Sequence, residues 1–181
     1  MAEHPGASIA VIAEYKYGEH CIVAIQRDDI PGLAYAGWWE LPGGTLELGE
    51  TPEEGAVREC LEEVNVVVDP EDIHGNDEHL IEDPVNTVLV VAVVSLEKVL
   101  QMRLGDEGQA CKLFRLNDFL TDNSVIPEQR MRVQRYLYSI TAAALAQYNA
   151  TTVMASNALD QRRVTVPEQS QGQLQITSAI D

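Results

Sequence analysis

Hydrophobic and polar residues follow one another along this chain in short runs typical of β-strands, interrupted by two stretches with helical spacing. Two β-branched runs, residues 7–14 and 21–27, flank the turn-like sequence Lys16-Tyr17-Gly18-Glu19 and predict a β-hairpin. Further strands are predicted over residues 73–81, 86–95 and 110–116, and helices over residues 52–64 and 127–148. Because strands and helices do not alternate regularly, the pattern favours an α+β fold with a mixed β-sheet over a doubly wound parallel sheet.

The first predicted helix has well-marked ends and two different faces. Thr51 suits the N-cap position, Pro52 suits the first helical position, and Glu54 completes a capping box. Apolar residues form one stripe, at Ala56, Val57, Cys60, Leu61 and Val64. Another face carries three glutamates at the spacing i, i+3 and i+4, namely Glu59, Glu62 and Glu63. This cluster is either a solvated acidic face or a site for hard divalent cations, which prefer oxygen ligands.

The charge balance excludes several classes of partner. The chain has 181 residues with 12 Lys plus Arg and 29 Asp plus Glu, which gives a formal net charge of −17. Such a surface repels DNA, RNA and anionic lipid, so neither a nucleic-acid polymer nor a membrane is expected as a partner. A site for phosphate groups in this chain therefore needs divalent cations or a few placed basic residues that reverse the local charge.

Composition also predicts the compartment and the domain organisation. The longest apolar run, residues 88–94, is far shorter than the roughly twenty residues of a spanning helix, and no secretory signal is apparent, so a cytoplasmic protein is expected. The cysteines are predicted to be reduced core thiols. Residues 1–148 are predicted to form one domain, and residues 149–181, rich in Ser, Thr, Gln and Ala, a loosely ordered polar tail.

A spaced set of glycine and charged residues surrounds the first predicted helix. Gly44 is followed by five residues and Glu50, and then by seven residues and the run Arg58-Glu59-Cys60-Leu61-Glu62-Glu63-Val64-Asn65-Val66. This arrangement resembles the Nudix box, the loop-helix-loop signature of Nudix hydrolases. Only Asn65 departs from the signature, which has Gly there, and Asn is the next most common residue at a left-handed helix end.

The resemblance extends over about residues 7–138 and is to the MutT-type members of the family, which degrade nucleoside triphosphates. It implies the Nudix fold, an α/β/α sandwich with the mixed sheet between helices, for the domain over residues 1–148. It also implies Mg²⁺, with Mn²⁺ as an alternative, held by the carbonyl of Gly44 and by the carboxylates of Glu59, Glu62, Glu63 and Glu107. Glu107 lies in the run Gly105-Asp106-Glu107-Gly108-Gln109, which is similar to the MutT-type loop motif ending in Glu-Gly-Gln.

Further roles follow from the resemblance for individual residues. The implied catalytic residues are Arg58, Glu59, Glu62, Glu63 and Glu107. Among them, Arg58 orients the carboxylates and pairs with Glu50, while the base is either Glu59 or Glu107. The implied substrate-binding residues are Arg27, Leu41 and Asn123.

The implied activity is a metal-dependent hydrolysis of the diphosphate linkage in a nucleoside diphosphate derivative. The leading substrate is a nucleoside triphosphate, with oxidised dGTP among the candidates, cleaved to the monophosphate and pyrophosphate. The alternatives are an ADP-ribose or nucleotide-sugar pyrophosphatase and a non-catalytic module that senses a nucleotide. The intact metal-ligand glutamates favour an enzyme, and both a monomer and a homodimer stay open.

Overall fold

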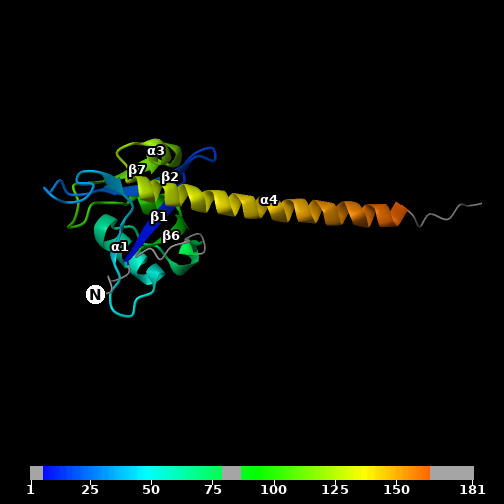
Figure 1. Ribbon diagram of the computed structural model, residues 1–181, viewed down its shortest axis with the longest axis horizontal. Helices are drawn as coiled ribbons and strands as arrows, with labels where there is room; N and C mark the ends of the chain where they lie inside the picture. Colours follow the sequence, from blue (N-terminus) through cyan, green and yellow to red (C-terminus); the bar gives the residue numbers. More distant parts are fainter. Residues whose placement is uncertain (1–5, 79–86, 164–181) are drawn as a thin grey trace, which may run out of the picture. The chain divides into compact units, whose positions relative to one another are not determined.

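The chain divides into two compact units. The structure is a computed structural model that describes residues 6–78 and 87–163 (Figure 1). Contacts separate a first unit, Met1–Ser139, from a second unit, Ile140–Asp181. The first unit contains the β-sheet and all the residues predicted for the site.

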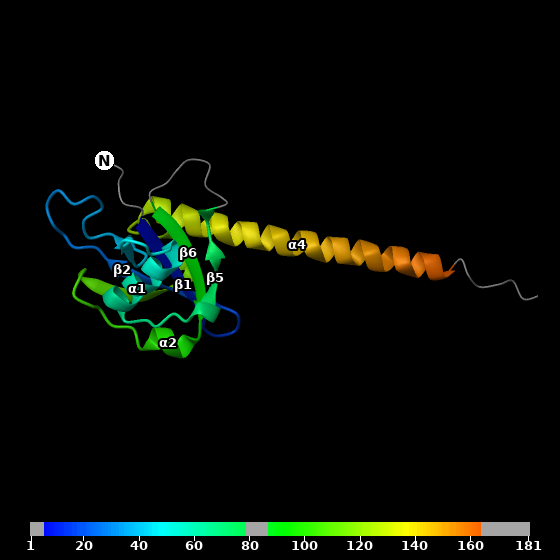
Figure 2. The same ribbon diagram turned by 90° about the horizontal axis from the view of Figure 1, so that it is seen from below.

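A mixed sheet forms the centre of the first unit. Its strands are β1 (Gly6–Glu14), β2 (His20–Gln26), β3 (Trp39–Glu40), β4 (Gly43–Thr45), β5 (Ile73–Asn76), β6 (Thr87–Val94) and β7 (Ala110–Arg115). The main path runs β3-β2-β1-β6-β5, while β4 pairs with β1 and β7 pairs with β2. β1 and β6 run parallel and the other pairs run antiparallel, which confirms the predicted mixed sheet and hairpin. Figure 2 shows β5 and β6 side by side.

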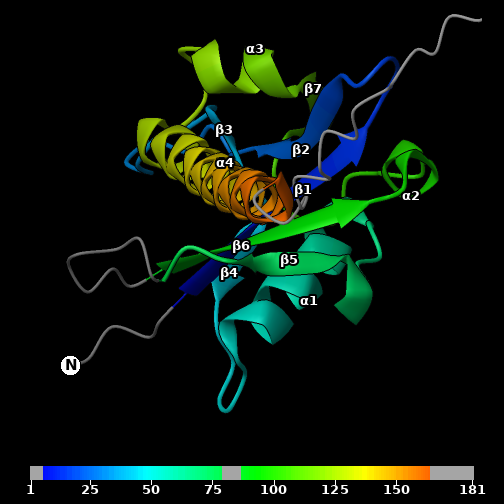
Figure 3. The same cartoon turned by 90° about the vertical axis from the view of Figure 1, so that its right-hand side faces the viewer.

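Helices cover both faces of this sheet (Figure 3). The helical elements are α1 (Pro52–Val64), the short 3-10 helix η1 (Pro70–Asp72), α2 (Leu96–Leu100), α3 (Leu116–Thr121) and α4 (Pro127–Arg163). α1 and α2 pack against one face through Ala56, Cys60 and Val99. α3 and the first turns of α4 pack against the other face through Phe119, Val133 and Tyr136. This arrangement confirms the predicted α+β sandwich.

The central strand β1 is buried on both faces because nearly all of its residues are small or apolar. Ile9 and Val11 point toward α1, whereas Ala10 and Ile12 point toward α3 and α4. A strand covered on both faces reads as a continuous apolar run and not as an alternating one. Ser8 is the exception in this strand, since it is polar and only 4% exposed.

The helix α1 begins and ends at the capping residues predicted from the sequence. The Thr51 hydroxyl accepts from the Glu54 N–H, and the Glu54 carboxylate accepts from the Thr51 N–H. At the other end Asn65 has a φ of 53° and donates its N–H to the carbonyl of Leu61. Asn therefore takes over the left-handed position at which the signature has Gly.

The second long helix is longer than expected. α4 begins at Pro127 as predicted but runs to Arg163, past the predicted end at Tyr148. The remaining tail, residues 164–181, and the predicted strand residues 79–81 lie outside the described residues. The division into a domain over residues 1–148 and a tail over residues 149–181 stays a prediction.

Two further expectations concern the cysteines and membranes. Cys21 and Cys60 are buried, Cys111 is half-buried, and all three are free thiols, as predicted. Burial raises the pKa of Cys60 to about 12, so this thiol is unreactive. Within residues 6–78 and 87–163, no helix combines the length and the apolar character needed to cross a membrane.

Candidate active site

Arg58 of α1 donates hydrogen bonds to three carboxylates. Its Nε and Nη2 atoms donate to the two carboxylate oxygens of Glu50 at 2.7 and 3.0 Å. Its Nη1 donates to Glu59 at 2.9 Å and to Glu62 at 3.4 Å. The hydrogen bond from Arg58 lowers the pKa of Glu50, which keeps this carboxylate ionised. The predicted pair of Glu50 and Arg58 is therefore confirmed.

The side chains of Glu59 and Glu62 differ in their exposure to solvent. The Glu59 side chain is 17% exposed, whereas that of Glu62 is 62% exposed. Glu59 lies against Gly44, where an added Cβ atom would stand only 2.5 Å from the Glu59 Oε1. Gly44 is thus the residue that lets the loop before α1 approach the Glu59 carboxylate.

Glu63 is a partly buried carboxylate of the predicted set. Its Oε2 accepts a hydrogen bond of 2.9 Å from the N–H of Gly43. Burial, together with the negative charges of Glu59, Glu40 and Glu107, raises the pKa of Glu63 to about 7. The protein therefore gathers negative charge at Glu63 with no basic side chain hydrogen-bonded to it among the described residues, a situation that favours a cation.

A distant loop brings Glu107 to this carboxylate cluster. The loop is docked on the end of α1, since the N–H groups of Arg103 and Gly105 donate to the carbonyls of Val64 and Glu63 at 3.1 and 2.8 Å. Gly105 is required there because an added Cβ atom would overlap the backbone carbonyl of Glu62. The MutT-type loop predicted from the sequence thus lies beside the predicted helix.

Glu63 and Glu107 line one cavity of about 280 Å³, which we call the carboxylate cavity. Its other lining residues are Ile25, Gln26, Arg27, Asp28, Ile30, Leu33, Glu40 and Gly108. Sequence reasoning missed Glu40. The available signal was a charged residue in the short strand directly before the Pro42-Gly43-Gly44 turn.

Arg27 and Glu40 form an ion pair in the wall of the carboxylate cavity. Arg27 Nη1 donates to both oxygens of Glu40, at 2.7 and 2.6 Å, and Arg27 Nε donates to the carbonyl of Ala34. Burial raises the pKa of Glu40, although the Arg27 guanidinium opposes this rise. Arg27 is the one predicted substrate-binding residue that lines the cavity with Glu63 and Glu107.

The two other predicted substrate-binding residues lie elsewhere. Leu41 is only 1% exposed and lines a neighbouring cavity of about 390 Å³. Asn123 is exposed in the turn before α4, and it is not among the lining residues of the carboxylate cavity or of this neighbouring cavity. Substrate contact by Arg27, Leu41 and Asn123 stays a prediction.

The predicted metal ligands match a hard divalent cation in their chemistry. All of them offer oxygen, and the mutual effect of the carboxylates on Glu63 indicates that a cation would relieve repulsion between them. In residues 6–78 and 87–163, no group of three or more His, Cys, Asp or Glu side chains converges on one point. Glu59 and Glu62 are hydrogen-bonded to Arg58, so these side chains have to turn before they share an ion.

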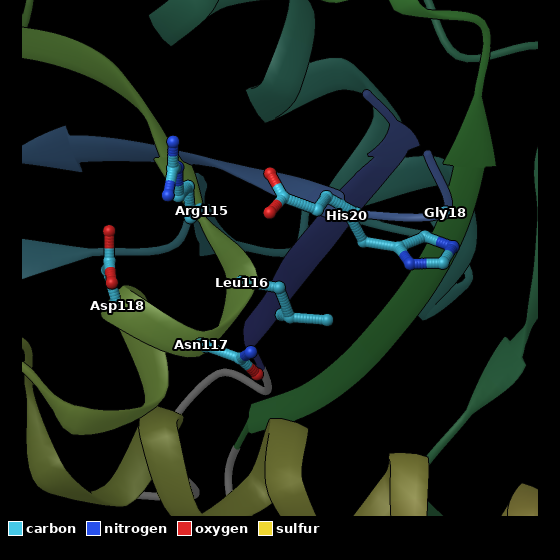
Figure 4. Close-up of a pocket in the computed structure, with 7 residues that line it drawn as sticks. Gly18, His20, Arg115, Leu116, Asn117 and Asp118 are labelled. Carbon is cyan, nitrogen blue, oxygen red and sulfur yellow. The ribbon is translucent and has the colours of Figure 1, made fainter. Parts of the chain in front are cut away.

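A separate cavity of about 290 Å³ lies between the β1–β2 turn and the start of α3 (Figure 4). It is lined by Gly18, Glu19, His20, Arg115, Leu116, Asn117 and Asp118. None of the predicted site residues belongs to it. The site is therefore assigned to the carboxylate cavity and its neighbour.

Comparisons with known proteins indicate the family of this chain. The family model described as "NUDIX domain" matches residues 3–134. A MutT-like protein of Streptomyces ambofaciens is 46% identical over 54 residues, which are 30% of this chain and 31% of that protein. An ADP-ribose pyrophosphatase of Methanocaldococcus jannaschii is 30% identical over 119 residues, 64% of either chain. This chain therefore spans less than two thirds of the length of both curated relatives.

A solved structure shares the fold. The crystal structure of a mutT/nudix family protein from Listeria innocua superposes with a TM-score of 0.62 at 19% identity. The likeness covers 81% of this chain and 99% of that one.

Proposed function

The chain belongs to the Nudix family, and we propose that it is a MutT-type hydrolase that cleaves a nucleoside triphosphate to the monophosphate and pyrophosphate. One observation carries the proposal. Glu63 of α1 and Glu107 of a loop distant in sequence line the same cavity, together with the cationic side chain of Arg27. The carboxylates can bind divalent cations, and the guanidinium can bind phosphate. The cavity therefore suits a phosphorylated substrate with bound cations.

The residues of the site have separate tasks in the proposed reaction. Arg58 is hydrogen-bonded to Glu59 and Glu62 until they turn to bind the metal, and the N–H of Gly43 positions Glu63. When bound, Mg²⁺, or Mn²⁺ as an alternative, neutralises the phosphate charge and lowers the pKa of a coordinated water. The oxygen of the attacking water bonds to phosphorus, and the P–O bond to the leaving pyrophosphate or nucleoside monophosphate breaks. A water proton passes to Glu59 or Glu107.

A second candidate is hydrolysis of ADP-ribose or a nucleotide sugar. The similarity to the ADP-ribose pyrophosphatase covers 119 residues and so reaches well beyond α1 and its flanks. The same carboxylates would cleave this substrate, because the bond is again a phosphoric anhydride. Only the group attached to the diphosphate differs between the two candidates.

A substrate screen tests the proposal. Metal-depleted protein is assayed with nucleoside triphosphates, oxidised dGTP, ADP-ribose, nucleotide sugars and dinucleotide polyphosphates, before and after addition of Mg²⁺ or Mn²⁺. Fastest turnover of a triphosphate after addition of metal supports the first candidate, and fastest turnover of ADP-ribose supports the second. Nucleotide binding without any turnover would instead indicate a non-catalytic sensing module.

Glu107→Gln tests the contribution of the loop. We expect kcat to fall roughly tenfold to a hundredfold with a smaller change in KM, because the lost charge acts on the water or the metal in the transition state. Asp106→Asn is the matched control, since it removes the same charge from the adjacent exposed residue. A change in KM alone would show that the loop only shapes the cavity.

A further inference from the structure

The loop that carries Glu107 is attached to the rest of the first unit at both of its ends. At its start, Arg103 and Gly105 donate their N–H groups to carbonyls at the end of α1. At its end, Gln109 lies directly before β7 and donates its N–H to the carbonyl of Gln26 at 2.8 Å. Glu107 lies between the two attachments, so its position in the carboxylate cavity depends on both.

The side chain of Gln109 makes a second bond at the same end of the loop. Its Nε2 donates to the carbonyl of Arg27 at 2.6 Å, across a sequence separation of 82 residues. Gln109 is thus bonded to two successive carbonyls of the chain, those of Gln26 and Arg27. A single hydrogen bond lets a segment rotate about that bond, and a second one beside it removes this freedom.

Arg27 is a fixed anchor for the Gln109 amide. Its N–H donates to the carbonyl of Trp38 at 2.9 Å. Its guanidinium donates to the carboxylate of Glu40 and to the carbonyl of Ala34. A residue that is bonded through both its main chain and its side chain moves little, so Gln109 connects the loop to a rigid point of the fold.

Glu107 itself lacks comparable support. The residue is exposed, and its carboxylate accepts no hydrogen bond from another described residue. Gly108, which separates it from Gln109, has a φ of 81°, and an added Cβ atom there would stand 2.8 Å from the carbonyl oxygen of Gln26. The loop therefore approaches β2 closely at Gly108, and the bonds of Gln109 determine where the Glu107 side chain begins.

We propose that Gln109 is a positioning residue, which holds Glu107 in the carboxylate cavity through its bond to the Arg27 carbonyl. The proposal rests on the proposed function, in which Glu107 acts on the metal or on the attacking water. A displacement of about 1 Å removes much of the rate effect of such a group, because the reacting atoms no longer align. Gln109 touches neither the phosphates nor the metal in this proposal, so its whole effect passes through Glu107.

Gln109→Met tests the role of the amide, because methionine keeps the length of the side chain but has no N–H donor. We expect kcat to fall about fivefold to twentyfold with a smaller change in KM. The thermal midpoint should fall by no more than about 4 °C, since one exposed hydrogen bond is lost. Gln101→Met is the matched control, because Gln101 is exposed after α2 and is not among the lining residues of the carboxylate cavity. It should leave both measurements unchanged.

A double-mutant cycle separates positioning of Glu107 from a purely structural role. In the Glu107→Gln background, Gln109→Met should lower kcat by no more than about twofold, because the carboxylate that it positions is already lost. Losses that multiply in the double variant would overturn the proposal, since Gln109 would then act independently of Glu107. An unchanged kcat in Gln109→Met alone would also overturn it.

NMR relaxation of the full chain provides a readout that needs no substrate. The order parameter of the Glu107 amide should be about 0.85 in the parent protein, the value of rigid backbone, and should fall toward about 0.6 in Gln109→Met. An unchanged order parameter would overturn the proposal. If the parent protein hydrolyses no phosphoric anhydride, the proposed function fails, and the order parameter still decides whether Gln109 positions Glu107.

Discussion

Glu63→Gln is expected to lower metal-dependent turnover about a hundredfold or more while the protein stays folded. The amide oxygen of Gln can still accept the hydrogen bond from the Gly43 N–H, so the local backbone is kept. The negative charge proposed to bind metal is lost. Burial and the neighbouring carboxylates already raise the pKa of Glu63, so a neutral side chain should leave the thermal midpoint unchanged or higher.

Steady-state kinetics and thermal unfolding of the same preparation check this expectation. Glu97→Gln removes the same charge from α2, away from the carboxylate cavity, and should leave both measurements unchanged. Turnover within a few-fold of the parent protein would refute the assignment of Glu63 to the metal. A loss of turnover accompanied by a fall in the thermal midpoint would point to a structural role.

Gly43→Ala is expected to reduce the free energy of unfolding by about 3 kcal/mol or more. Gly43 has a φ of 154°, and an added Cβ atom would overlap the carbonyl oxygen of Ala7 and stand 2.5 Å from the Ser8 Cα. These atoms belong to β1, the central strand, which is paired or packed on every side and cannot move aside. The thermal midpoint should fall by roughly 6–12 °C.

Gly49→Ala is the control for this substitution. Gly49 also has a positive φ, of 92°, but an added Cβ atom would meet nothing within 4 Å. It should therefore show only the backbone cost, about 1–2 kcal/mol. Equal destabilisation by the two substitutions would show that the close approach of β4 to β1 is not what requires glycine at position 43.

Local signals in the sequence were sufficient for α1 and for the carboxylates that it carries. Capping by Thr51 and the left-handed Asn65 depend on neighbouring residues, so their pattern can be read without knowledge of the fold. Placement of Glu107 beside Glu63 followed from the resemblance to MutT-type proteins and could not follow from periodicity. The loop is held against α1 by backbone hydrogen bonds, and such bonds cannot be recognised from the pattern of apolar and polar residues.

Glu40 was not predicted as a site residue. It comes from β3, and only the folded chain brings it into the same cavity as Glu63 and Glu107. The length of α4 was underestimated for a different reason. Few large apolar residues after Tyr148 indicate little packing, but alanines there retain a strong intrinsic preference for helix.

The docking of the Glu107 loop on α1 has a consequence for how the site opens. A helix end has carbonyl groups without partners in the helix, and here Arg103 and Gly105 donate to two carbonyls of the last turn. Fraying of that turn breaks the bonds of the loop, and release of the loop leaves the carbonyls of Glu63 and Val64 unpaired. The loop and the last turn of α1 should therefore unfold together as one cooperative segment, with equal hydrogen-exchange protection at the amides of Arg103 and Gly105.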